Sequence, residues 1–167
     1  DSASSFKGGL KYSVGPAGFV SLGGSPDSAN DAQMLAASES YYEYSQTTRR
    51  VTKTKTHGGT QEYSIAFTQS PFADGYNNWH RKAVLTTPDG GTKTVYSNHA
   101  GQDLLIDLEK GSDHWITYMR YNGDGRLIER ASPSAIDMSG TPYDEWEADL
   151  DVQLKEDEGL IRVTTYY

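Results

Sequence analysis

Short runs of strand-forming residues, each bounded by turn residues, recur along most of this sequence. This recurrence constrains the fold more than any other feature. Two glycine-led segments echo one another, since Gly58-Gly-Thr-Gln-Glu-Tyr63 resembles Gly90-Gly-Thr-Lys-Thr-Val-Tyr96. A repeat spacing of roughly 25 to 32 residues corresponds to one β-hairpin per repeat. Hairpins stacked side by side can bury a face that none of them buries alone.

The runs pair in sequence as antiparallel hairpins, with turn residues such as Pro88-Asp89-Gly90-Gly91 between them. The clearest alternation of hydrophobic and acidic residues lies over 145–155 and predicts a half-buried strand there. We expect an all-β fold of tandem antiparallel hairpins, with at most one short helix. The predicted hairpins are 51–56 with 63–67, 83–87 with 92–96, 103–108 with 114–121, 114–121 with 126–129, and 145–155 with 160–166.

The chain divides by composition into two parts. Residues 1–40 are rich in glycine and serine and predict an N-terminal edge segment of short strands and turns, able to serve as a donated strand. The one expected helix lies in this part, over 31–38, where Asn30 or Asp31 can cap good helix formers. Residues 41–167 are predicted to form the hairpin array.

Charge and composition exclude several classes of function. The net charge of −8 argues against binding to a nucleic-acid backbone. No apolar run approaches the length of a membrane helix, so we expect no membrane insertion. The chain has no cysteine, which excludes disulfides, zinc fingers, iron–sulfur clusters and thiol catalysis.

One repeat-like motif is specific enough to indicate a family. The segment Tyr121-Asn122-Gly123-Asp124-Gly125-Arg126-Leu127 resembles the signature of the RHS, or YD-repeat, proteins, which is Tyr-Asp, two variable residues and Gly-Arg-Leu. The segment 96–104, with Tyr96 and Gly101, matches more loosely, with one extra residue and Gln in place of Arg. We identify the chain as similar to a fragment of a long RHS-like repeat protein.

The motif is physically a turn signature and not a catalytic one. Asn122 can cap a turn and Gly125 can take a positive φ, while Tyr121 and Leu127 flank them as strand residues. The resemblance implies a long β-sheet that coils into a spiral or a hollow shell in an exported bacterial polypeptide, and hence an extracellular or cell-surface location. Nothing in the sequence resembles the toxin cargo or the autoproteolytic segment of that family.

Polar residues offer little evidence for an enzyme. The four histidines are isolated, without metal-ligand spacing, which favours surface or capping roles. The carboxylates of 144–151 are predicted to lie side by side on one strand, a pattern that favours a solvated face over a divalent-cation site or a catalytic pair. We therefore expect no catalytic residue, no metal and no cofactor.

Aromatic residues provide the alternative function. Tyr76, Trp79, Trp115 and Tyr118 could form a platform on which a sugar ring stacks, as in a carbohydrate-binding adhesive module. The leading hypothesis is instead a noncatalytic structural module. Its unpaired strand edges would pair with other copies of the chain, or with the remainder of a longer RHS-like chain, in a shell or fibre.

Overall fold

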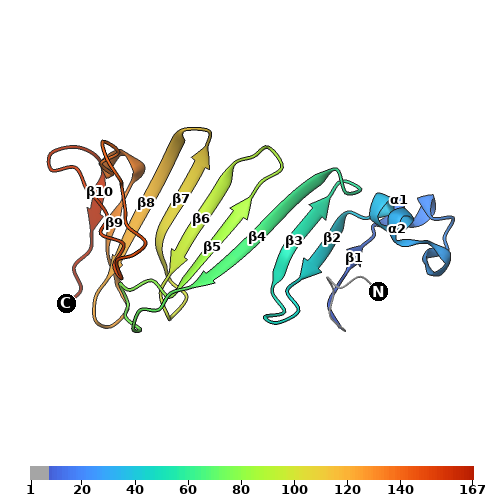
Figure 1. Cartoon of the computed structure of the whole chain (residues 1–167), viewed down its shortest axis with the longest axis horizontal. Coiled ribbons are helices and arrows are strands. Elements are labelled where there is room, and N and C mark those ends of the chain that lie inside the picture. The colour runs from blue at the N-terminus through green and yellow to red at the C-terminus, as the bar shows by residue number, and fades with distance from the viewer. Residues whose placement is uncertain (1–7) are drawn as a thin grey trace. The chain divides into compact units, whose positions relative to one another are not determined.

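The computed structural model describes residues 8–167, which form antiparallel hairpins in chain order (Figure 1). The chain divides into two compact units, Asp1–Ala66 with Thr86–Asp89, and Phe67–Leu85 with Gly90–Tyr167. The all-β prediction is confirmed. Residues 1–7 of the predicted N-terminal edge segment lie outside the described residues.

The first unit contains four strands in the order β1 (Tyr12–Ser13), β2 (Ser40–Tyr44), β3 (Val51–Thr56) and β4 (Gln61–Gln69), the last of which ends beyond the unit. The hairpin of β3 and β4 is the one predicted from the sequence, and Lys53 lies opposite Ser64 in it. The buried hydrophobic side chain among the described residues of this unit is Tyr41. Backbone pairing therefore contributes more to this ribbon than a hydrophobic core does.

The second unit contains, again in chain order, β5 (Arg81–Thr86), the last residue of which belongs to the first unit, β6 (Thr92–Ser97), β7 (Asp103–Lys110), β8 (Asp113–Tyr121), β9 (Leu127–Ala131) and β10 (Ile161–Val163). The predicted hairpins at β5–β6, β7–β8 and β8–β9 are present. The turn between β7 and β8 is tighter than predicted, because the strands extend to Lys110 and from Asp113.

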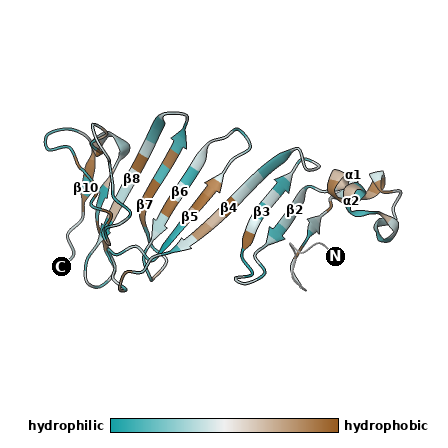
Figure 2. Cartoon of the chain, in the orientation of Figure 1, coloured by the Kyte–Doolittle hydropathy of each residue, from teal (hydrophilic) through white to brown (hydrophobic). Residues whose placement is uncertain are grey.

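The hydrophobic core lies in the second unit, on one face of its sheet. Paired residues share a face, so Leu105 and Tyr118 lie together, as do Asp107 and Ile116. The segment that follows β9 covers this face with Ile136 and other buried residues. Hydrophobic bands cross the middle of β5 and β7 (Figure 2). The fully buried members of the core include Tyr96, Leu104, Leu105, Ile116, Ala131, Ala135, Ile136 and Leu150.

The strand predicted over 145–155 is wrong. This segment is a series of turns, with a single β-bridge between Ile136 and Leu154. Leu150 is fully buried and has a left-handed backbone, with φ +69°, which no extended strand allows. The predicted partner strand pairs with β9 instead, where Arg162 lies opposite Arg130. The carboxylates of 144–151 therefore do not share one strand face.

Helical structure is confined to short segments. The predicted helix is confirmed as α2 (Asp31–Ala37), and Asn30 and Gln33 form a reciprocal capping box at its start. A second helix, α1 (Pro16–Ser21), lies where strands and turns were expected. Two 3₁₀ turns, Pro26–Ser28 and Pro133–Ala135, complete the helical residues. No helix among residues 8–167 has the length and apolar character needed to cross a bilayer.

Candidate functional site

The turn between β8 and β9 is built around the side chain of Asn122. Its Oδ1 accepts hydrogen bonds from the backbone N–H groups of Asp124 (3.0 Å) and Arg126 (2.9 Å). The backbone N–H of Asn122 donates to the carbonyl of Arg126, and that of Gly125 donates to the carbonyl of Asn122. Gly125 has φ +76°, a value that glycine adopts without strain. Sequence reasoning placed each of these residues in the turn.

The turn between β6 and β7 has the same construction, 24 positions earlier by residue number. Asn98 Oδ1 accepts from the N–H groups of Ala100 and Gln102, both at 3.0 Å. The backbone bonds between Asn98, Gly101 and Gln102 repeat those of the later turn, and Gly101 has φ +81°. Asn98 and Gln102 thus correspond to Asn122 and Arg126.

The extra residue of the earlier motif places its tyrosine one position further from the turn. The β6–β7 pairing shifts register between Tyr96 and Ser97, and the β8–β9 pairing shifts at the equivalent place, between Arg120 and Tyr121. The unpaired residue of each bulge lies on the strand after the turn, so the bulges are alike and only the position of the tyrosine differs. Tyr121 donates its hydroxyl to the carbonyl of Asp103 at 2.8 Å, whereas Tyr96 points into the core.

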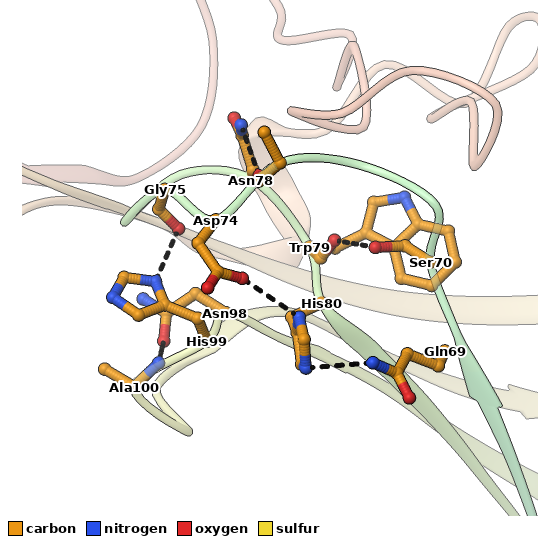
Figure 3. Close-up of polar contacts among 11 residues, drawn as sticks. Gln69, Ser70, Asp74, Gly75, Asn78, Trp79, His80, Asn98, His99 and Ala100 are labelled. Carbon is orange, nitrogen blue, oxygen red and sulfur yellow. Dashed lines mark hydrogen bonds and ion pairs between the residues drawn. The ribbon is translucent and has the colours of Figure 1, made fainter.

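The two turns are joined laterally to each other and to the loop before β5. Gln102 Nε2 donates to the carbonyl of Gly125 at 2.8 Å. Asn98 Nδ2 donates to the carbonyl of Tyr76 at 2.9 Å. In Figure 3, His99 also approaches this loop, with its Nδ1 3.2 Å from the carbonyl of Gly75. These bonds connect one repeat to the next at the same end of the hairpins.

The aromatic residues proposed as a sugar platform are not brought together on an exposed face. Trp79 and Tyr118 are buried in the core, and burial raises the pKa of Tyr118 to about 12. Tyr76 packs against Gly125, where a Cβ would lie 2.6 Å from its ring. Trp115 is 47% exposed but lies on the opposite face, because its neighbour Ile116 is in the core. Buried rings cannot offer a face to a sugar.

A groove of about 620 Å³ lies where residues 138–146 pass over β5–β8. A chain of polar contacts follows it. The ammonium of Lys82 donates to the carboxylate of Glu145, which also accepts from the hydroxyl of Tyr96 at 2.9 Å. The contacts continue through three further residues. The ring of Tyr143 lies edge-on to that of Tyr96, its hydroxyl donates to Asp107 at 3.1 Å, and Asp107 lies 3.1 Å from Nδ1 of His114.

Burial and hydrogen bonding determine which groups in this row of polar contacts carry a proton. Burial raises the pKa values of Tyr96 and Tyr143 above that of an ordinary phenol, so both hydroxyls remain donors. The hydrogen bond from the Lys82 ammonium, followed by that from Tyr96, lowers the pKa of Glu145 below the usual range of a carboxyl. The groove therefore presents the Lys82–Glu145 ion pair and the two neutral tyrosine hydroxyls at neutral pH.

Sequence reasoning missed this groove, because its residues come from β5, β6, β7, β8 and the irregular segment after β9. His114 was expected to have a surface or capping role and instead contacts Asp107, a carboxylate that is 4% exposed. His80 lies 3.2 Å from Asp74 and contacts Gln69 (Figure 3). Across residues 8–167, no group of three or more histidines and carboxylates could hold a metal ion.

Comparisons of the chain with protein-family models, with curated proteins and with solved structures give no match. The resemblance to RHS proteins thus rests on the residues of the two turns, and it stays a prediction.

Proposed function

We propose that the chain is a noncatalytic structural module of an exported RHS-like protein, located outside the cell or at its surface. Its hairpins contribute to a shell or fibre by lateral pairing of β-strands. The added strand comes from another copy of the chain or from the remainder of a longer RHS-like chain. In both cases an edge of the sheet accepts a strand. In a purified sample the only available partner is another copy of the chain, so the proposal predicts self-association there.

The observation that carries the proposal is the repetition of one turn construction with a lateral bond between its copies. Asn98 and Asn122 organise their turns through the same hydrogen bonds, and Gln102 joins the first turn to the second. Such bonds act between neighbouring hairpins, so they can be repeated for each hairpin added to the array. At the second turn, Arg126 occupies the position of Gln102.

The strand β10 provides an edge with the required chemistry. Ser132 donates to the carbonyl of Leu160, and Thr164 donates to the carbonyl of Ile128. Because the backbone groups of alternate residues point to opposite sides in an antiparallel ladder, those of Ile161 and Val163 point away from β9. The Val163 side chain is 71% exposed. This edge can accept a strand without any change in its pairing with β9.

The experiment is analytical ultracentrifugation of the chain over a range of concentrations, with two variants of Val163. Val163→Pro removes an outward N–H, whereas Val163→Thr keeps the N–H and the β-branched shape and serves as the matched control. We expect the wild-type chain and the threonine variant to form particles that grow with concentration, and the proline variant to remain monomeric. Association of all three to the same extent, or a monomeric wild type throughout, would contradict the proposal.

The same experiment separates a fibre from a closed dimer. Pairing of β10 in one copy with a different edge, such as β1, in the next copy is head-to-tail, so it adds further copies and forms an open fibre unless the rotation between copies closes a ring. Pairing of β10 with β10 of a second copy uses the same edge twice and ends at two copies. A wild type that stops at the dimer would contradict assembly into a fibre.

A further inference from the structure

Trp146 is an exposed aromatic residue on a hydrogen-bonded turn. The residue is 81% exposed, although burial of a tryptophan is strongly favourable. Its backbone N–H donates to Oδ1 of Asp144 at 2.9 Å, so the turn that carries it is closed by a side chain. Trp146 is therefore presented to solvent by an ordered turn.

The loop that carries Trp146 is anchored at both ends. The N–H of Asp144 donates to the carbonyl of Leu150 at 2.7 Å, and the indole N–H of Trp79 donates to the carbonyl of Glu145 at 3.2 Å. Leu150 is fully buried with φ +69°, and Asp151 follows with φ +36°. Positive φ values at two successive non-glycine residues are strained, and the core contacts of Leu150 hold them in place.

Two hollows lie beside Trp146. One is the groove of about 620 Å³ described above, and the other has a volume of about 220 Å³ and is lined by Phe72 and Trp79 among others. Both hollows include Lys82, Glu145 and Trp146 in their walls. The volume of the larger is in the range of small-molecule sites. The smaller hollow is mainly apolar, whereas the lining of the larger is polar and apolar in about equal parts.

The polar groups of the groove favour a ligand without net charge. Lys82 is paired with Glu145. The Asp107 carboxylate accepts from the Tyr143 hydroxyl and lies 3.1 Å from Nδ1 of His114. A charged ligand would therefore have to break the ion pair or displace these contacts. The hydroxyls and carboxylates that remain can exchange hydrogen bonds with a ligand that carries many hydroxyl groups. The exposed face of an indole suits the apolar face of a sugar ring.

We propose that this groove binds a neutral oligosaccharide, with one sugar ring on the face of Trp146 and the polar chain from Glu145 to His114 along its hydroxyl groups. The site uses a face of the second unit and not the edge of β10. Binding and lateral pairing are therefore independent of each other.

The experiment is a calorimetric titration of the chain with three neutral probes, cellotetraose, maltotetraose and chitotetraose, and with tetralysine as a charged probe. The chain offers a matched pair of tryptophan variants. Trp146→Ala removes the exposed ring beside the groove, and Trp115→Ala removes an exposed ring from the opposite face of the sheet. Both side chains are exposed, so both variants are expected to fold.

We expect at least one neutral probe to bind. Trp146→Ala should weaken this binding by about tenfold or more, as for the loss of a stacking residue, while Trp115→Ala leaves it unchanged. Glu145→Gln, which removes the charge that holds Lys82, should weaken it as well. The proposal is overturned if none of the neutral probes binds at about 10 mM. It is also overturned if tetralysine binds in preference to them, or if the two tryptophan variants behave alike.

Discussion

Asn98 and Asn122 occupy the same position in two turns of the same construction, yet replacement by aspartate should destabilise the fold at Asn98 and leave it nearly unchanged at Asn122. The family signature that the later turn resembles has Asp at this position, and Oδ1 of Asn122 is the side-chain atom that bonds the turn. Aspartate keeps that acceptor, so Asn122→Asp should change the free energy of unfolding by no more than about 0.5 kcal/mol.

Asn98 differs because its amide nitrogen is also used. The residue is 2% exposed, and its Nδ2 donates to the carbonyl of Tyr76 and to Oε1 of Gln102, both at 2.9 Å. In Asn98→Asp a carboxylate oxygen faces two acceptors. A flip of the Gln102 amide would restore one contact but lose the bond to Gly125. Two lost bonds of about 1 kcal/mol each, together with a buried charge, lower the free energy of unfolding by about 3 kcal/mol or more.

The assay is urea unfolding of the wild type and the two variants at pH 7, followed by tryptophan fluorescence, because Trp79 lies in the core. The transition midpoint of Asn98→Asp should fall well below that of Asn122→Asp, with no change in the slope of the transition. Equal midpoints for the two variants would refute the reasoning, since they would show that the donor bonds of Asn98 contribute nothing.

Two further predictions concern a glycine and an ion pair. Gly159→Ala should destabilise the fold by more than 2 kcal/mol, roughly twice the effect of Gly90→Ala. Both glycines have positive φ, but a Cβ at Gly159 would lie 2.3 Å from Ala135 Cα, whereas a Cβ at Gly90 would meet nothing within 4 Å. Thermal unfolding of the two variants measures the difference in stability, and equal losses would contradict the prediction. Lys82→Met should destabilise the chain at pH 7, and by less at a pH of about 3. The pKa of Glu145 is lower in the folded state than in the unfolded state, so its ion pair with Lys82 stabilises the fold above the ordinary carboxyl pKa. This stabilisation is lost as the pH falls through the pKa of the folded state. Urea unfolding at both pH values tests this, and a pH-independent loss would contradict it.

The hairpins could be predicted because local turn chemistry determines them. The turn at Asn122 has an Asx acceptor and a glycine at positive φ, and β3 and β4 flank the glycines that follow His57. The capping box of α2 is similarly local. The helix α1 was missed, although Pro16 directly after Gly15 is a typical helix start.

The segment 144–151 could not be predicted from its alternation, because tertiary packing determines its conformation. Leu150 fills the core from a left-handed backbone, and alternation cannot distinguish this from a strand residue. A local signal was present, since Asp144 and Asp149 each accept from the N–H two residues later and aspartate favours such turns. The groove and its polar chain depend on this segment, so neither could be predicted before it.

The most direct test of lateral pairing is amide hydrogen exchange in β10, resolved by residue and measured at several protein concentrations. The N–H of Arg162 faces β9 and should be protected at every concentration. Protection of Ile161 and Val163, whose N–H groups face away, should rise with concentration as an added strand covers them. If these two amides exchange freely at concentrations where larger particles form, assembly does not use this edge and the account is contradicted.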